Sequence, residues 1–432
     1  NAKLVSDNDT TNYTFRGRFE TSAQAVSIGY ESSQKAHQFL RYLVNSRGVV
    51  CGEQVILSFT IGSMENTLPP PLDDTKSIWD FVVENAGPQT ETDRQIALRA
   101  VTGADYAEAL EEALAGTRYT KMMEQHAKTA VLALDAPISG RMSITFYREL
   151  ACKEYLERIA EWHSDCKWNQ VFWRAEDGKR TPVSFIGAPS VDKIIEAVFG
   201  KPRSFNDEGY TKVKKAARER LLRCIFDGAF LPTDYVVSAI RRASNPLAVT
   251  RNGKFDRNGF GQILSTACAL VRKDFKQRNT EDYTLSLESE RTDRDYLYGR
   301  LLGAADKLEE YALYRNKKDR IVTAAIRHMQ TFSQRPFRTW KTIHDCLNPY
   351  IQAVKGSFAF QEIEAVKNLF RSNDFKNDVP LDGSYLLGYY HERAYIDQLV
   401  AEAKAKKQTE TASENQSSTN ESEENHEPDE QN

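Results

Sequence analysis

The chain is 432 residues long, with 40% hydrophobic residues, 28% charged residues and a net charge of −3. This length predicts two or three domains. No apolar run approaches the roughly 20 residues that a membrane-spanning helix needs, and no charged-then-apolar leader follows Asn1. We therefore expect no membrane segment and no secretory signal, and the start at Asn1 indicates a fragment of a longer protein.

The first 63 residues predict a mixed α/β segment. Two stretches, Ala25–Ile28 and Val49–Ile61, have the β-rich composition of strands. Between them, Ser32–Val44 has a helical pattern, with Ser32 or Ser33 as the expected N-cap.

Residues 64–188 predict an α+β region. Three consecutive prolines within residues 64–76 predict an extended linker at its start. Helices are expected within residues 91–125 and over about Leu150–His163. Between them, a loop at Ala136–Gly140 joins two β-like runs into a predicted hairpin. These runs are Thr129–Leu134 and Arg141–Tyr147.

From about residue 189 onward, the sequence predicts helices and no strand. In Tyr210–Phe226, one stripe is expected to be buried: Val213, Ala217, Leu221 and Cys224. In Asp293–Tyr314, a 4-3-4-3 spacing predicts the seam of a helix bundle: Leu297, Leu301, Ala304, Leu308 and Tyr311. Thr292 and Asp295 have the spacing of a capping box at the start of this helix. The remaining helices are Asp319–Phe332, one that Pro336 opens and Pro349 interrupts, Phe358–Phe370 and Ser384–Lys404.

Positive charge is concentrated in the second half of the chain, ahead of an acidic tail. Residues 408–432 contain eight acidic residues and no Lys or Arg, and their polar composition predicts a disordered tail over residues 406–432. Residues 201–280 hold 17 Lys and Arg against seven Asp and Glu, and residues 291–371 hold 15 against nine. Segregated positive charge is typical of a surface that binds a polyanion. An ordinary solvated face is the alternative.

The basic side chains of residues 201–280 predict a positive groove that holds nucleic-acid strands without reading their sequence. Off the buried stripe of Tyr210–Phe226, Lys212, Lys215 and Arg223 are expected to be free to face a partner. Further cations extend this predicted surface: Arg241, Arg242, Arg272 and Lys273.

Arginine and aromatic residues alternate in two short stretches. The first, Tyr13–Phe19, contains Arg16 and Arg18, and the second contains Arg335, Arg338 and Lys341 beside Phe337 and Trp340. Such a mixture supplies phosphate contacts and aromatic faces on which bases stack. The alternative is an aromatic side chain in the core with arginines extending outward to solvent.

The sequence contains no recognisable catalytic motif. The patterns GxxxxGK[ST], HExxH and GxSxG, which mark phosphate-binding loops, zinc proteases and hydrolases, do not occur. The adjacent His344 and Asp345 have no second pair nearby. The glycine-rich Gly253–Gly261 predicts a flexible loop between helices, with a phosphate-contacting loop as the alternative. We therefore expect that the protein is not an enzyme and has no metal ion or cofactor.

The six cysteines are dispersed and form no CxxC pair, so we expect reduced thiols in a cytoplasmic protein. Cys152, His163 and Cys166 lie close together in the sequence. They do not share one face of the predicted helix and lack a fourth ligand, so zinc is not expected there.

Seven stretches resemble one family, the large subunit of the type I-C CRISPR effector complex, Cascade. They follow the expected order and cover residues 11–19, 27–43, 139–150, 293–313, 334–343, 347–350 and 382–393. The resemblance implies a non-catalytic subunit that contacts crRNA, double-stranded target DNA and the displaced strand. It also implies a role in recognising the protospacer-adjacent motif (PAM). The partners it implies are the backbone and crRNA-handle subunits, the small subunits and the helicase–nuclease.

The resemblance also bears on the domain organisation. Family members carry a further region ahead of the part similar to Asn1, so residues 1–63 are expected to be the remainder of a larger N-terminal domain. The C-terminal helical region resembles the Cascade small subunit. The expected parts after the α+β region are a basic helical region (189–290), a small-subunit-like bundle (291–405) and the acidic tail (406–432).

The segment around residues 30–35 is the candidate for PAM recognition, which needs polar side chains at base edges and cations on phosphates. We expect a strand-to-helix loop that offers both, together with a helix N-terminus. Its residues are Tyr30, Ser32, Ser33, Gln34 and Lys35. The alternative is a helix cap and nothing more.

Two other functions are compatible with a basic helical protein. One is a metal-dependent nuclease, which the lack of clustered acids and histidines disfavours. The other is a stand-alone helical scaffold that binds nucleic acid or acidic protein partners.

Overall fold

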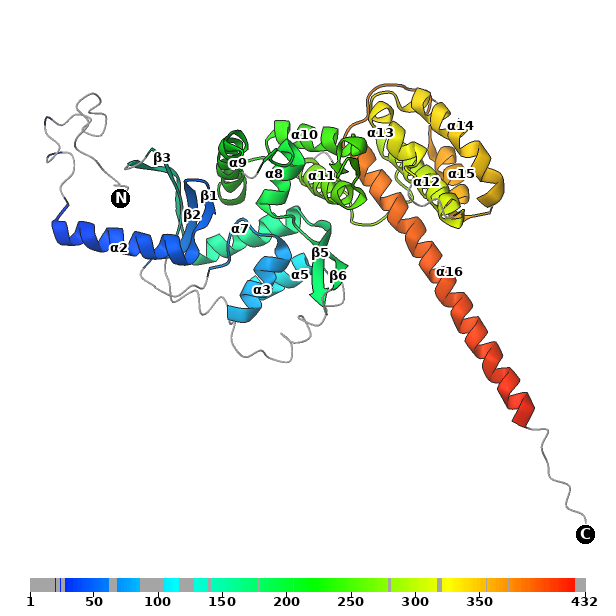
Figure 1. Ribbon diagram of the computed structural model, residues 1–432, viewed down its shortest axis with the longest axis horizontal. Coiled ribbons are helices and arrows are strands. Elements are labelled where there is room, and N and C mark those ends of the chain that lie inside the picture. Colours follow the sequence, from blue (N-terminus) through cyan, green and yellow to red (C-terminus); the bar gives the residue numbers. More distant parts are fainter. Residues whose placement is uncertain are drawn as a thin grey trace, which may run out of the picture. The chain divides into compact units, whose positions relative to one another are not determined.

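The structure is a computed structural model that describes residues 20, 24, 28–61, 68–85, 105–115, 128–138, 141–176, 179–204, 206–278, 281–316, 321–354, 356–371 and 373–423. The chain divides into two compact units (Figure 1). The first comprises Asn1–Ala239 and Ser265–Glu281, and the second Ile240–Leu264 and Asp282–Asn432. The expected fold class, an α+β part followed by a mainly helical region, is confirmed. No helix within the described ranges is both long and apolar enough to span a membrane.

A four-stranded antiparallel sheet organises the start of the first unit. Its order is β1 (Val49–Cys51), β2 (Gln54–Thr60), β3 (Thr129–Ile138) and β4 (Arg141–Leu150). The predicted β3–β4 hairpin is therefore confirmed and longer than expected, whereas the predicted strand at Val49–Ile61 divides into β1 and β2. Within the described residues β4 is an edge strand, and Arg148 on it donates to both carboxylate oxygens of Asp227, at 2.5 and 2.6 Å.

Helix α2 (Tyr30–Arg47) packs on one face of this sheet. Its Leu43 forms a buried cluster with Leu57 and Leu134, because alternate side chains of a strand point to the same face. The side chains on the opposite face are buried as well: Ile56, Val131 and Ala133. The predicted helix is thus confirmed. The strand expected at Ala25–Ile28 lies almost wholly outside the described residues.

The rest of the first unit adds helices and a second hairpin. Its elements are α3 (Thr75–Asn85), α5 (Tyr106–Ala115), α7 (Cys152–Asp165), β5 (Trp168–Glu176), β6 (Lys179–Gly187), α8 (Val191–Phe199), α9 (Glu208–Phe226) and parts of α10 (Thr233–Ala243) and α11 (Arg257–Gln277). Helix α5 confirms the described part of the helix expected within residues 91–125. The hairpin β5–β6 was not predicted.

The proline-rich segment does not behave as a loose linker where it is described. Leu68 and Leu72 are buried, and the carbonyl of Pro69 accepts a hydrogen bond of 2.6 Å from the Tyr155 hydroxyl. The amide of Val191 donates to the carbonyl of Leu72 at 2.9 Å. These contacts hold the segment in the first unit, so the expected linker is wrong for residues 68–74, and α3 begins at Thr75.

In the second unit, helix α12 (Arg294–Arg315) lies among α13 (Ala324–Gln334), α14 (Pro336–Val354), α15 (Phe358–Leu369) and α16 (Ser384–Glu423). Four of the five predicted seam residues are fully buried: Leu297, Leu301, Ala304 and Leu308. The fifth, Tyr311, is 45% exposed, so its assignment to the seam is wrong. The same holds for Val213 on α9, which is 39% exposed. Next to Tyr311, Ala312 and Leu313 are buried, so the covered face of α12 passes to one side of Tyr311.

Helices α12 and α16 cross at very short range because glycines face the partner backbone. A Cβ atom on Gly299 would overlap the carbonyl oxygen of Tyr385, and one on Gly388 would overlap that of Tyr296. A Cβ atom on Gly303 would lie 2.8 Å from the Tyr389 carbonyl oxygen. Glycine permits this approach since it lacks a Cβ atom.

A short hairpin corrects the expectation that no strand follows residue 189. Strands β7 (Thr250–Arg251) and β8 (Lys254–Phe255) are joined by Asn252 and Gly253, which have φ of 53° and 73°. Two consecutive positive φ angles are typical of a type I′ turn. Gly259 and Gly261 lie in α11, where Asp256 accepts a hydrogen bond from the Gly259 amide at 3.0 Å. Gly253–Gly261 is therefore a turn, a strand and a helix start.

Three further predictions concern helix ends. The capping box of Thr292 and Asp295 is wrong, because Asp293 is the N-cap and Asp295 instead accepts a hydrogen bond from the Asp382 amide at 2.7 Å. Pro336 opens α14 as predicted, but Pro349 lies inside the helix and does not interrupt it. Helix α16 extends to Glu423 and so enters the acidic tail, of which residues 424–432 are not described.

Candidate nucleic-acid interface

Lys215 belongs to the fold and not to a free basic face. Its side chain is buried, and its Nζ donates to Glu53 Oε2 at 2.7 Å and to Asp135 Oδ1 at 2.9 Å. Burial disfavours the charge of Lys215, but the hydrogen bonds to both carboxylates outweigh this effect and raise its pKa. The expectation that Lys215 is free to face a partner is therefore wrong, because the sheet supplies two acids against α9.

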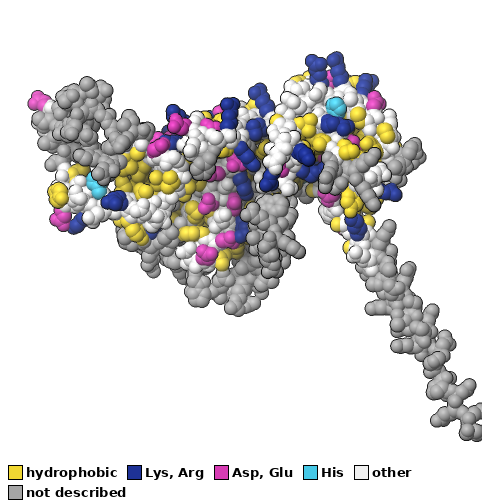
Figure 2. All heavy atoms as spheres, in the orientation of Figure 1, with side chains coloured by type: hydrophobic (Ala, Val, Ile, Leu, Met, Phe, Trp, Pro, Cys, Tyr) yellow, Lys and Arg dark blue, Asp and Glu magenta, His cyan; other side chains and the backbone are white. Residues whose placement is uncertain are grey.

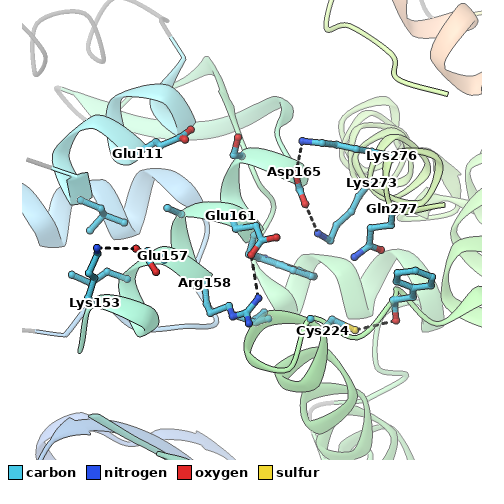
Figure 3. Close-up of a pocket in the computed structure, with 18 residues that line it drawn as sticks. Glu111, Lys153, Glu157, Arg158, Glu161, Asp165, Cys224, Lys273, Lys276 and Gln277 are labelled. Carbon is cyan, nitrogen blue, oxygen red and sulfur yellow. Dashed lines mark hydrogen bonds and ion pairs between the residues drawn. The ribbon is translucent and has the colours of Figure 1, made fainter. Parts of the chain in front are cut away.

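Arg272 and Lys273 on α11 are likewise buried and tied to the end of α7 (Figure 3). Lys273 Nζ lies 3.0 Å from Asp165 Oδ2, and Lys276 Nζ lies 2.7 Å from Asp165 Oδ1. Arg272 donates to the Asp165 carbonyl oxygen at 3.3 Å. Burial disfavours the carboxylate, but both ammonium groups outweigh it and lower the pKa of Asp165. The assignment of Arg272 and Lys273 to a strand-binding face is therefore wrong.

The pocket beside this cluster does not favour a polyanion. It has a volume of about 900 Å³ and is lined by four basic side chains and four acidic ones (Figure 3). Several of these charges are already paired, as in Arg158 Nη1 and Glu161 Oε2 at 3.4 Å. The balance of charge makes this a poor place for a phosphate backbone, whose affinity depends on unneutralised cations.

The remaining predicted cations reach solvent. Lys212 and Arg223 on α9 are exposed, as are Arg241 in the last turn of α10 and Arg335, Arg338 and Lys341 near the start of α14. Figure 2 shows Lys and Arg side chains on the outer face of the second unit, over the part where α13 and α14 lie in Figure 1. The exposed predicted cations of the second unit are Arg241, Arg335, Arg338 and Lys341, which we call its basic face.

The aromatic residues beside this face pack within the protein. Trp340 is only 3% exposed, so it belongs to the core. Phe337 is half-buried and packs edge-on against Phe375, with ring centroids 5.6 Å apart. Lys341 lies over the ring of Phe337 at 4.4 Å, and Arg338 lies 3.1 Å from Asp378 with 72% of its side chain exposed. The stretch is thus an aromatic core edge with exposed cations. Arg16 and Arg18 lie outside the described residues.

A cleft within the second unit brings two of the predicted arginines together with amides. It has a volume of about 410 Å³ and is lined by Arg241, Arg242, Asn245, Gln330 and Gln334, with Ile240, Ser244, Ala248, Val249, Ser333 and Leu381. No acidic side chain lines it. The Nε atom of Arg242 is buried, and none of the described residues accepts its proton. We call this the arginine cleft. Its three amides were not predicted, because Asn245 precedes the short helix Pro246–Ala248 whereas Gln330 and Gln334 lie on α13.

Residues 30–35 do not form the expected loop. Helix α2 begins at Tyr30 with Gly29 as its N-cap, so neither Ser32 nor Ser33 is the cap. Tyr30 is 82% exposed, Ser32, Gln34 and Lys35 are exposed, and Ser33 is half-buried. Lys35 Nζ lies 2.7 Å from Glu31 Oε1, an exposed pair one turn apart. These side chains therefore lie on the first two turns of a helix.

Within the described part of the chain, no group of three His, Cys, Asp or Glu side chains is placed to hold a metal ion. Cys152, His163 and Cys166 are all buried, and His163 Nδ1 lies 2.7 Å from Thr75 Oγ1. Burial lowers the pKa of His163 to about 4 and raises the pKa of Cys166 to about 12.

Comparison with known proteins identifies a family. A family model described as CRISPR-associated protein (Cas_Csd1) matches residues 1–396, most of the chain. No curated protein matches the sequence.

Proposed function

Since the chain belongs to the Cas_Csd1 family of CRISPR-associated proteins, the large subunits of type I-C Cascade, we propose that it is a non-catalytic subunit that binds crRNA and target DNA. In this proposal it contributes to PAM recognition, stabilises the opened DNA strands and offers a docking surface for the helicase–nuclease. The observation that carries the proposal is the exposed basic face of the second unit. Its cations remain available to phosphates, because exposed ion pairs such as that of Arg338 and Asp378 are weak.

Reversing the charge at Arg241, Arg335 and Arg338 is expected to weaken target-DNA binding by the assembled complex about tenfold or more. Each lost phosphate contact also lowers the slope of log affinity against log salt by roughly 0.7–0.9. The measurement is DNA affinity of the complex at two salt concentrations. Lys153→Glu is the matched control, because Lys153 is also exposed but lies on α7 in the charge-balanced pocket. Unchanged affinity of the triple variant at both salt concentrations would remove the basis for the proposal.

A second test concerns α2. Substituting Gln34 and Lys35 by alanine is expected to reduce binding to PAM-containing duplex more than binding to pre-opened DNA, since only the duplex requires PAM recognition. The same assays on Gln38→Ala, an exposed side chain one turn further along α2, provide the control. An equal loss on both DNA substrates would show that these residues do not recognise the PAM.

The alternative of a metal-dependent nuclease has a direct test. The proposal expects no cleavage when the purified chain is incubated with labelled DNA and Mg²⁺ or Mn²⁺. Cleavage that chelation abolishes, and that survives further purification, would instead assign catalysis to the chain.

A further inference from the structure

The arginine cleft is lined by three kinds of side chain, which are cationic, amide and apolar. Two guanidinium groups come from the last turn of α10, amides come from Asn245 and from Gln330 and Gln334 on α13, and apolar side chains line the remaining wall. We propose that this cleft binds a single unpaired nucleotide, with its phosphate at Arg241 and Arg242 and its base against the amides. The inference rests on the proposed function, because it specifies which form of nucleic acid one part of the basic face accepts.

The arginines point to an anion. Cations in the last turn of a helix also stabilise its dipole, so Arg241 and Arg242 could be explained by α10 alone. That explanation does not account for the position of both arginines in a cleft that no acidic side chain lines. A phosphate in the cleft would be neutralised by both guanidinium groups.

The amides point to a base as the second component. The side-chain amides of Asn245 and Gln330 make no hydrogen bond to another described residue, and each presents a donor and an acceptor. Base edges also present donors and acceptors side by side, and Asn and Gln are common partners for them. The flat apolar face of a base can lie against Val249 and Leu381. Amides from two elements within one cleft therefore match a base edge better than they match a bare anion.

The nucleotide must be unpaired. In a duplex, a base is paired and stacked between its neighbours, so it could not enter a concave site. Proteins that contact the Watson–Crick edge of a base take single-stranded nucleotides or turn one out of the helix. The volume of about 410 Å³ falls in the range of roughly 300–1,000 Å³ found for small-molecule sites.

An acidic peptide is the competing occupant. Its carboxylates would satisfy the arginines, and its backbone N–H groups could donate to the amide oxygens of Asn245 and Gln330. Its acidic side chains present no flat ring to the apolar wall at Val249 and Leu381. A nucleotide therefore uses more of the cleft, and the experiment below separates the two.

The test uses the assembled complex with two DNA probes of one sequence, one fully paired and one with a pre-opened central region. The sequence does not match the crRNA, so the complex cannot open the paired probe by guide pairing. The variant combines Asn245→Leu and Gln330→Leu, which removes the amides and leaves the charge unchanged. We expect it to bind the pre-opened probe about tenfold more weakly, as for loss of one good base contact, with the fully paired probe and the salt dependence unaffected. Gln361→Leu, an exposed amide on α15, is the matched control.

Equal losses of affinity for both probes would overturn the proposal, and so would no loss for either. Loss of a protein subunit from the purified variant complex would also overturn it and would assign the cleft to a peptide. A second measurement guards against misfolding. In the unaltered complex, a photoreactive thymidine in the opened strand should crosslink to peptides containing residues 240–249 or 330–334. Crosslinks confined to other peptides would also overturn it. If charge reversal at Arg241, Arg335 and Arg338 weakened DNA binding but the double leucine variant bound normally, only the nucleotide site would be refuted. The proposed function would stand.

Discussion

Substituting Gly388 by alanine is expected to lower the free energy of unfolding by more than about 3 kcal/mol. This is at or above the largest losses that are typical when a protein core is overpacked. The added methyl group would overlap the carbonyl oxygen of Tyr296 and approach the Arg300 amide at 3.1 Å. Backbone atoms cannot rotate away as a side chain can, so α12 and α16 would have to separate along their crossing. Urea denaturation followed by circular dichroism measures the change.

Gly261→Ala is the matched control for this prediction. Gly261 is also a helical glycine, but nothing lies within 4 Å of a Cβ atom built on it. Alanine is favoured over glycine in a helix by roughly 0.8–1.0 kcal/mol, so this variant should be neutral or more stable. If Gly388→Ala proved as stable as Gly261→Ala, the close crossing of α12 and α16 would be incorrect.

Asp165→Ala is expected to cost about 3–5 kcal/mol of folding free energy, as for removal of one member of a buried ion pair. The substitution leaves Lys273 without its carboxylate, and the side chain of Lys273 is only 4% exposed. Trp162 lies 5.1 Å from its ammonium group and offers a weaker partner than a carboxylate. The midpoint of urea unfolding and its slope give the loss.

Two neighbouring substitutions show whether the buried charge causes this loss. Lys276→Ala should cost no more than about 1 kcal/mol, because Lys276 is 45% exposed and Lys273 still pairs with Asp165. Adding Lys273→Met to Asp165→Ala should recover part of the stability, since no unpaired charge then remains buried. A double variant as unstable as Asp165→Ala alone would assign the loss to packing.

Sequence patterns predicted helices and one hairpin well where side chains repeat over many residues. The β3–β4 hairpin, α9 and the start of α14 at Pro336 were all identified. Boundaries and local breaks were less predictable, because they depend on single contacts. Pro349, for example, is accommodated inside α14, whereas the type I′ turn at Asn252 and Gly253 introduces strands too short to show a repeating pattern.

The candidate site was less predictable for a different reason. Lys212 and Lys215 lie three residues apart and look alike in the sequence, yet only Lys215 meets Glu53 and Asp135. The partner Asp165 of Lys273 is more than a hundred residues away. Which lysines are neutralised inside the protein is therefore decided by tertiary contacts. The arginine cleft was missed for the same reason, since Asn245 and Gln330 come together only in the fold.

The edge position of β4 bears on how the chain behaves outside its complex. A strand at the end of a sheet presents unpaired backbone groups, to which a strand of another molecule can add. Ile144 and Tyr147 on β4 are 58% and 48% exposed and would favour such association. The adjoining charges of Arg148 and Glu149 oppose it. The solubility of the isolated subunit thus depends on this pair of charges, and mutations that neutralise them would promote aggregation.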